Sequence, residues 1–420
     1  MPLPHGLRAF RHRDFGYYLA GKGLSQIGLW LQNIATSWLI YRLTGSAFLL
    51  GLATFAMYIP ITVLAPVVAV WVDRMSKRKV LVIAQGIALA QALVMFALVG
   101  TGHIEPWHLI AANLVIGVAN AFDGPARQSM IIELVDGRED LPNAIAFSSA
   151  LMNSARFIGP MLGGVVIAAF GELWGFGLNA LLYCAVLFAL WRIRPKRRAP
   201  EVSDASWRAQ FAEGFRWAWD FLPARCALLL VATLAITTQP YQALAPWFAK
   251  EVFGGDSRTL GVLIGAGGIG ALVGVLYLAI RPSIRGLLGL MPFSAAAAAL
   301  ALIAFTFTHH LAAGAACIFF IGTGLMLTAT ATNTVLQSIV EDRLRARVAA
   351  IYMLSFLGMS PIGALLAGWA AERIGPPLVL AIGGGLALAA AGVFRLMLPA
   401  MRREIRPVYD KIGITAKGDL

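Results

Sequence analysis

The chain has 420 residues, of which 59% are hydrophobic and only 13% charged, and its formal net charge at pH 7 is +13. Because soluble globular domains carry about 25% charged residues, this composition excludes a chain whose main solvent is water. The three cysteines, Cys184, Cys226 and Cys317, stand singly in apolar stretches without the spacing of a disulfide or zinc site. The sequence therefore predicts no metal and no cofactor.

Long apolar runs separated by short polar breaks follow one another along the whole sequence. A bilayer core of about 30 Å needs about 20 apolar residues per helix, and the first run is too long for a cleaved signal peptide. The predicted spans are 15–41, 46–71, 80–101, 107–126, 144–170, 173–193, 226–248, 259–280, 286–308, 311–333, 347–371 and 376–398. We therefore expect an all-α integral membrane protein with twelve transmembrane helices.

The basic residues are distributed unevenly between the polar breaks. If the amino terminus is cytoplasmic, 28 of the 34 Lys and Arg residues fall in cytoplasmic segments and four on the opposite side. This asymmetry follows the positive-inside rule, so we expect a bacterial inner-membrane protein with both termini in the cytoplasm. It also explains the basic composition without a nucleic-acid partner.

The longest polar stretch, 192–206, divides the chain almost at its centre, and segment 207–218 has the spacing of an amphipathic interfacial helix. In each half a Gln-Ser pair, at 128–129 and at 337–338, precedes a span that carries a proline. We expect an N-terminal six-helix bundle at 1–193, a cytoplasmic linker with the interfacial helix at 194–224, a C-terminal six-helix bundle at 225–400 and a cytoplasmic tail at 401–420.

The loop between the second and third spans reads Val-Asp-Arg-Met-Ser-Lys-Arg-Lys over 72–79. It resembles the loop signature of the major facilitator superfamily, G-x-x-x-D-R-x-x-R-R/K, although Ala69 and Ser76 replace two of its residues. The resemblance implies two pseudo-symmetric six-helix bundles and a gate in which an acid docks on a helix amino terminus while cations bind acids and lipid headgroups. The gate residues would be Asp73, Arg74, Lys77 and Arg78. A plain basic stop-transfer loop is the alternative.

The fifth predicted span contains Gly159-Pro160-Met-Leu-Gly163-Gly164, which resembles the antiporter signature of the superfamily's exporters. Proline frees a backbone carbonyl and glycines allow close approach, so we expect this helix to bend and seal during alternating access. A purely structural kink is the alternative. The runs at 44–46, 125–128 and 141–144 also resemble the subgroup that contains enterobactin exporters and multidrug efflux proteins.

Polar residues recur every three or four positions along several spans. Charged side chains in lipid cost about 2.5–3.5 kcal/mol each, so we expect them to face protein or a water-filled cavity. The resemblance implies that helices 1, 4, 7 and 10 surround the central path. The predicted cavity or coupling residues are Lys22, Gln26, Asn33, Asn113, Asn120, Asp123, Asn153, Arg156, Gln239, Tyr241, Gln242 and Asn333. Hydrogen bonding between packed helices is the alternative for any one of them.

Two charged positions within the spans carry specific hypotheses. Asp123 lies about 6 Å above Arg127 along one helix, and we interpret it as a gate lock paired with Lys22 or Lys77 rather than as the alternative, a proton carrier. Arg127 belongs to the same gate. Arg156, in the middle of a span, is expected to support substrate binding or occlusion; bonding to carbonyls freed near Pro160 is its alternative.

Two segments resemble nucleotide-binding motifs without their context. The run 16–22 begins like a phosphate-binding loop, but Gly23 stands where Ser or Thr should bind magnesium, and no strand precedes it. The run 265–270 fits a dinucleotide fingerprint but lies inside an apolar span, without an acid about 20 residues on. We expect no enzyme.

The function expected from these features is secondary active transport. The hypothesis is a proton-coupled, monomeric exporter of amphipathic small molecules, such as drugs or siderophores, that works by alternating access among membrane lipids. The alternative is a translocator of lysophospholipids or other lipids from the same superfamily. A membrane enzyme or assembly scaffold is the least favoured hypothesis.

Overall fold

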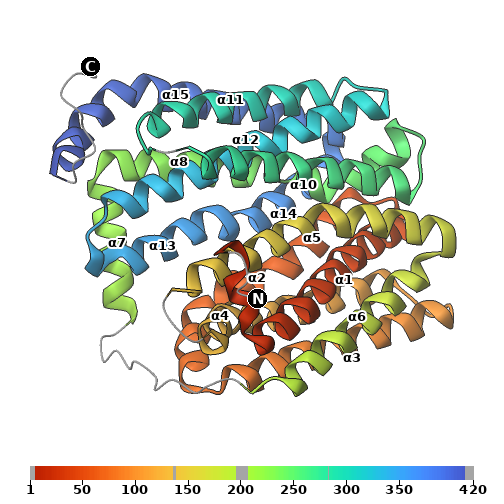
Figure 1. Cartoon of the computed structure of the whole chain (residues 1–420). Helices are drawn as coiled ribbons and strands as arrows, with labels where there is room; N and C mark the ends of the chain where they lie inside the picture. Colours follow the sequence, from red (N-terminus) through yellow and green to blue (C-terminus); the bar gives the residue numbers. More distant parts are fainter. Residues whose placement is uncertain (1–4, 136–138, 195–206, 282, 412–420) are drawn as a thin grey trace. The chain divides into compact units, whose positions relative to one another are not determined.

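The computed structural model describes residues 5–135, 139–194, 207–281 and 283–411. Within these ranges the side chains of residues 5–7, 65–67, 69, 70, 73, 74, 207–210, 342 and 411 lie outside the description. The described residues are mostly helical and contain no strand (Figure 1). The architecture is the all-α one that the hydrophobic runs predict.

Eleven helical segments of the described chain are long and apolar enough to cross a membrane. The first helix, α1, is not among them because its polar stripe lowers its hydropathy, yet its 32 residues extend about 48 Å, more than a bilayer core requires. Counted with α1, the spans number twelve, as predicted. The long helices are α1 (Arg13–Thr44), α2 (Ala47–Arg74), α3 (Lys77–Gly100), α4 (Pro106–Leu134), α5 (Leu141–Phe170), α6 (Glu172–Arg192), α10 (Ser257–Ala279), α11 (Leu287–Phe305), α12 (Leu311–Ile339) and α15 (Pro376–Lys411).

Two of the predicted spans are interrupted in the structure. The span predicted at 226–248 is α8 (Leu222–Thr237), a turn, α9 (Tyr241–Trp247) and the π-helix η2 (Phe248–Val252). Pro240 in the turn has no N–H to continue the helical ladder, which accounts for the break. The span predicted at 347–371 is α13 (Arg345–Met353), the π-helix η4 (Leu354–Gly358) and α14 (Ser360–Ile374), with Pro361 in the first turn of α14.

Local sequence explains how the first two helices meet. Gly45, just after α1, has φ of 64°, a left-handed conformation that glycine adopts without steric cost, and its N–H reaches the Tyr41 carbonyl. Ser46 then caps α2, since its hydroxyl accepts from the Leu49 N–H at 3.2 Å. The turn is two residues long because each residue serves one helix end.

The contacts divide the chain into two compact units, Met1–Ser203 with Ala245–Gly265, and Asp204–Leu244 with Ala266–Leu420. In the first unit α1 packs against α5 and α6, α2 against α4, and α3 against α4 and α6. In the second unit α11 packs against α12 and α15, and α8 against α15. A short segment from the second half of the sequence, 245–265, therefore packs with the first six helices.

The linker helix α7 (Trp207–Asp220) packs on α13 within the second unit. Glu213 accepts from Arg343 at 2.6 Å and also from Arg347. A Cβ added at Gly214 would lie 2.8 Å from the Arg347 Cβ, so glycine permits this close approach. The amphipathic helix expected at 207–218 is thus present, and α13 is one of its partners.

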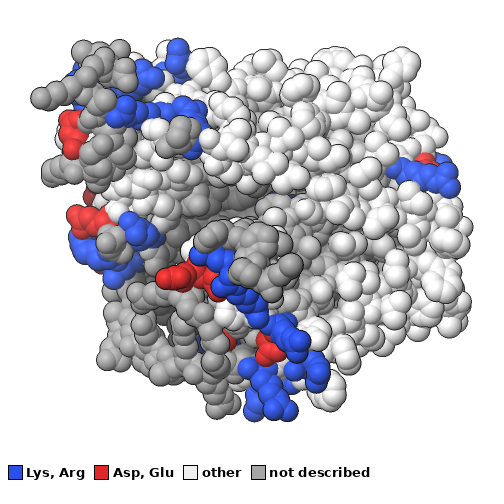
Figure 2. Space-filling view, viewed as in Figure 1, with Lys and Arg blue, Asp and Glu red and all other residues white. Residues whose placement is uncertain are grey.

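The surface is suited to lipid. On the face shown in Figure 2 most of the surface is uncharged, and Lys and Arg gather in a few groups. Large apolar side chains stand free of protein contact, as with Leu396 at 81% and Ile280 at 80% exposure. Such exposure over many helices is unfavourable in water and favourable in a hydrocarbon solvent, which confirms the membrane class.

Candidate functional site

A buried ion pair joins α1 to α4 inside the first unit. The Lys22 ammonium donates to both carboxylate oxygens of Asp123, at 2.8 and 2.9 Å, and the two residues are only 5% and 6% exposed. Charges this far from water are stable only when paired and hydrogen-bonded, because desolvation costs several kcal/mol per ion. Lys22 is one of the two partners that the sequence suggests for Asp123.

Two further groups surround the same carboxylate. Gln85 on α3 donates from Nε2 to the Asp123 Oδ1 at 2.7 Å. The Arg127 Nε lies 3.7 Å from Oδ2, one turn further along α4, and has no hydrogen-bond partner in the described structure, so its contribution is electrostatic. Asp123 therefore connects three helices, and the cluster of one acid and two cations has an excess of one positive charge.

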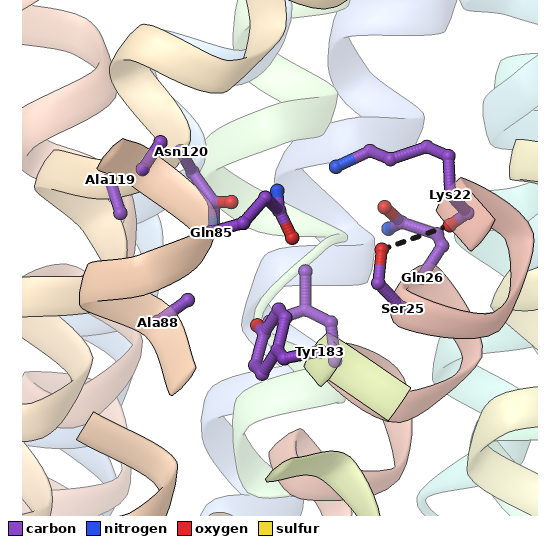
Figure 3. Close-up of a pocket in the computed structure, with 10 residues that line it drawn as sticks. Lys22, Ser25, Gln26, Gln85, Ala88, Ala119, Asn120 and Tyr183 are labelled. Carbon is purple, nitrogen blue, oxygen red and sulfur yellow. Dashed lines mark hydrogen bonds between the residues drawn. The ribbon is translucent and has the colours of Figure 1, made fainter. Parts of the chain in front are cut away.

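A small pocket lies beside this ion pair, between α1, α3, α4 and α6 (Figure 3). Its lining residues are Lys22, Ser25, Gln26, Leu29, Ala84, Gln85, Ala88, Ala119, Asn120 and Tyr183. The Oε1 atom of Gln85 is buried there without a hydrogen-bond partner in the described structure. The pocket thus places the unpaired Gln85 Oε1 acceptor near the Lys22 ammonium, and this combination suits a water molecule or a small polar group.

The pocket brings together three of the residues predicted from the polar stripes, Lys22, Gln26 and Asn120. Sequence reasoning missed Gln85 and Tyr183, which α3 and α6 contribute. The available signal was the presence of uncompensated amides within apolar runs, since an amide in lipid must find a partner on another helix.

A second polar cluster, also missed, lies further along α1. Asn179 donates to Gln32 at 2.6 Å, and Gln32 donates to Gln91 at 3.0 Å, so that α6, α1 and α3 are joined in order. All three side chains are buried. This arrangement pairs amides between packed helices, although the Asn179 Oδ1 atom has no hydrogen-bond partner in the described structure, and none of the three residues lines the pocket that surrounds Lys22.

The glycines of the predicted antiporter signature lie at close helix contacts. A Cβ added at Gly159 would lie 2.5 Å from the Trp30 Cβ of α1, and one added at Gly163 would lie 3.1 Å from the Leu31 Cα of the same helix. One added at Gly164 would lie 2.6 Å from the Ser257 carbonyl oxygen at the start of α10. The α5 backbone therefore approaches both α1 and the first turns of α10.

The contact between α5 and the start of α10 also carries polar bonds. The Ser257 hydroxyl donates to the Gly164 carbonyl at 3.1 Å, and a Cβ added at Gly261 would lie 2.7 Å from the Pro160 carbonyl. Near the end of α1, Tyr41 donates to Glu251 of η2 at 2.9 Å. Segment 245–265 is thus hydrogen-bonded to α1 and to α5 within the first unit.

The predicted gate loop is only partly described, because the side chains of Asp73 and Arg74 lie outside the described residues. Lys77 donates to the Val72 carbonyl at 2.6 Å. Arg78 donates to the carbonyls of Leu190 at 2.6 Å and Trp191 at 2.8 Å. A cation at these carbonyls caps the carboxyl end of α6 and complements its dipole.

Arg156 lies on α5 with its guanidinium carbon 5.9 Å from the centroid of the Trp30 ring on α1. This distance is within the range of a cation–π contact. In the part of the chain that the structure describes, Arg156 has neither an acidic partner nor a hydrogen bond to the carbonyls near Pro160. Bonding of Arg156 to carbonyls near Pro160 is thus not present among the described residues.

The other predicted cavity residues are dispersed. Asn113 is buried and donates to the Ala53 carbonyl at 3.0 Å, which ties α4 to α2. Asn153 donates to Ser149 within its own helix. Asn33 and Asn333 are half-buried on α1 and α12.

Three of the predicted residues in the second unit, Gln239, Tyr241 and Gln242, lie at the break between α8 and α9. Gln239 lies in the turn, and Gln242 donates to the Tyr241 hydroxyl at 3.3 Å. The Thr238 hydroxyl is buried there without a partner in the described structure. Among the described residues, no three His, Cys, Asp or Glu side chains come together as a metal site would require.

Comparison with known proteins places these features in a family. The sequence profile of the family described as "Transmembrane secretion effector" matches residues 5–410. The staphyloferrin A transporter of Staphylococcus aureus is 25% identical, with 86% of this chain and 90% of that protein covered. The multidrug efflux pump Tap of Mycolicibacterium fortuitum is 25% identical over 88% and 91% of the two chains. The enterobactin exporter EntS of Salmonella choleraesuis is 23% identical over 95% and 96%.

A solved structure shares the fold. The peptide transporter POT has a TM-score of 0.73 to this chain at 11% identity, with 93% of this chain and 95% of that chain covered. At this identity the likeness concerns the fold alone.

Proposed function

Because this chain belongs to the transmembrane secretion effector family of the major facilitator superfamily, we propose that it exports amphipathic small molecules by alternating access in exchange for protons. It is a membrane transporter and not an enzyme. The efflux pump and the enterobactin exporter among its relatives support the direction and the substrate class.

One observation carries the proposal: the buried Lys22–Asp123 pair with Gln85 and Arg127 around it. Burying an acid and two cations inside a membrane domain costs free energy, and such groups belong to a functional site more often than to a structural one. We assign Asp123 the role of a lock that holds α1, α3 and α4 together while it is ionised. Protonation would remove the charge that holds Lys22, so the lock is a place where a proton and helix movement can be linked.

The proposed orientation rests on charge. The excess of Lys and Arg in alternate loops supports an inner-membrane transporter with both termini in the cytoplasm. We propose that the chain works as a monomer in contact with membrane lipids.

Transport in proteoliposomes tests this function. The purified chain is reconstituted, and efflux or uptake of a panel of neutral, cationic and anionic amphipaths and of a lysophospholipid is measured with and without an imposed pH gradient. We expect gradient-dependent movement of amphipaths and its loss in Asp123→Asn. Transport of the lysophospholipid alone would identify a lipid translocator instead. Transport at the same rate with and without the pH gradient would contradict proton exchange.

A further inference from the structure

Arg156 is a cation with an unusual position in the first unit. It lies 15 residues after the start of α5 at Leu141, about 22 Å along the helix axis, and is therefore well inside a bilayer core of about 30 Å. The residue is half-buried. A guanidinium stays charged in proteins, so at this depth it needs acceptors from protein, water or a ligand.

The described structure supplies no acceptor for it. Ion pairs and hydrogen bonds of the described residues leave the Arg156 guanidinium without an acid or a carbonyl, and the guanidinium lies over an aromatic ring. Trp30 contributes the face of its ring, whose centroid lies 5.9 Å from the guanidinium carbon. This differs from Lys22 and Arg127, which share the carboxylate of Asp123.

A second donor beside Arg156 also lacks a partner. The Nε1 atom of Trp30 is buried and has no hydrogen bond in the described structure. A buried N–H without an acceptor costs about 1–3 kcal/mol, and an acceptor brought by a ligand would recover this cost. The guanidinium and the indole N–H belong to two neighbouring side chains on α5 and α1.

Gly159 allows α5 to pack closely against α1 beside Trp30. It lies one turn beyond Arg156, and an added Cβ would lie 2.5 Å from Trp30 Cβ and 3.0 Å from the Ile27 carbonyl oxygen. The contact brings the α1 and α5 backbones together at this level. The position of the Trp30 side chain against α5 therefore follows from backbone packing.

We propose that Arg156 and Trp30 bind an oxyanion of the transported amphipath, such as a carboxylate, sulfonate or phosphate, and that the chain selects anionic substrates by this pair. The inference rests on the proposed function and deepens it. The planar guanidinium binds two oxyanion oxygens side by side, the indole N–H supplies a further donor, and the Trp30 ring contacts the apolar body of the substrate.

A matched pair of probes tests the inference directly. The full chain in lipid nanodiscs is titrated with 2-naphthoate and with the neutral 2-naphthamide, which has the same ring system, and the binding constants are measured by calorimetry. We expect the parent to bind the naphthoate at least tenfold more tightly than the amide. Arg156→Gln should remove this preference by weakening naphthoate binding at least tenfold, with the amide changed less than twofold.

Two further variants separate charge from geometry. Arg156→Lys should recover only part of the preference, because an ammonium lacks the planar fork. Trp30→Phe retains a ring but not the N–H, and should weaken naphthoate binding severalfold more than amide binding. Arg42→Gln is the matched control, since Arg42 is exposed and pairs with Glu172 at the far end of α1; it should leave both constants unchanged. Thermal unfolding and monodisperse elution verify that each variant folds.

The outcomes decide separately on the two proposals. Equal binding of the two probes by the parent, or equal loss of both in Arg156→Gln, would overturn the anion site. If neutral amphipaths are nevertheless driven by the pH gradient in proteoliposomes, the proposed function stands without it. Arg156-dependent naphthoate binding without any transport would support the anion site and contradict the proposed exporter function. The same Arg156 dependence for lysophosphatidylglycerol, but not for naphthoate, would identify a lipid headgroup as the source of the oxyanion.

Discussion

The charged residues inside the first unit follow one physical rule, that a cation in a low-dielectric region requires a partner. Lys22 and Arg127 share Asp123, and Arg78 binds carbonyls at the end of α6. Arg156 departs from the rule in the described structure, which is why it carries the inference about an anionic ligand.

The first prediction concerns the ion pair. Asp123→Leu should lower the free energy of unfolding by about 3–5 kcal/mol, because it leaves the charges of Lys22 and Arg127 without an acid. Lys22→Met should lower it less, because Arg127 and Gln85 still face the Asp123 carboxylate. The double variant should be more stable than Asp123→Leu, since it removes Lys22 together with the acid and leaves only Arg127 uncompensated. Thermal or denaturant unfolding in detergent measures the order of the three.

Transport separates stability from function in the same set of variants. We expect the double variant to insert and fold but to lose gradient-driven transport. Single variants as stable as the parent would show that the pair is not the lock proposed for it.

The second prediction concerns Arg78. Arg78→Ala should destabilise the end of α6 by about 1–3 kcal/mol, because the carbonyls of Leu190 and Trp191 lose a charged donor. Hydrogen exchange over residues 188–194 should then become faster. Lys79→Ala, at an exposed neighbour, is the control and should not change it. Equal exchange in the two variants would mean that the cap is not needed.

At the scale of helices, glycine and proline decide where backbones meet and where they break. Gly159 and Gly163 bring α5 onto α1, and Gly164 brings it onto the start of α10. Pro240 lies at the break between α8 and α9. The predicted sealing function of α5 remains a proposal, and the contacts of Gly164 make it testable.

The third prediction therefore replaces that glycine. Gly164→Val should abolish transport while the chain still inserts, because a branched side chain cannot fit against the Ser257 carbonyl without separating α5 from α10. Gly86→Ala on α3, where an added Cβ meets no atom within 4 Å, is the matched control and should transport normally. Normal transport by Gly164→Val would reduce this contact to simple packing.

At the scale of the whole molecule, orientation in the membrane is set by charge outside the helices. Single cysteines are introduced in a variant without Cys184, Cys226 and Cys317, at exposed His103 or at exposed Glu404. The fourth prediction is that the cysteine at 103 reacts with membrane-impermeant thiol reagents in intact cells, whereas the one at 404 reacts only with permeant ones. Impermeant labelling at 404 would reverse the proposed topology.

The sequence by itself determined the solvent, the number of spans and the family. Apolar length is a property of consecutive residues, and the bilayer converts it directly into helices, so the twelve spans were predictable even where α1 is too polar to be recognised by hydropathy alone. The glycines of 159–164 could also be recognised as contact points, since the absence of a Cβ allows another helix to approach closely whichever helix that is.

Only the tertiary structure decided which polar groups meet. The stripes on single helices correctly indicated Lys22 and Asp123, but they did not reveal Gln85 and Tyr183, because their contribution depends on how α3 and α6 rotate toward α1 and α4. Asn113 belongs to the same periodic pattern and instead bonds the backbone of α2. A 3.6-residue period defines a helix face, whereas the neighbour that this face meets is chosen by the packing of all the helices together.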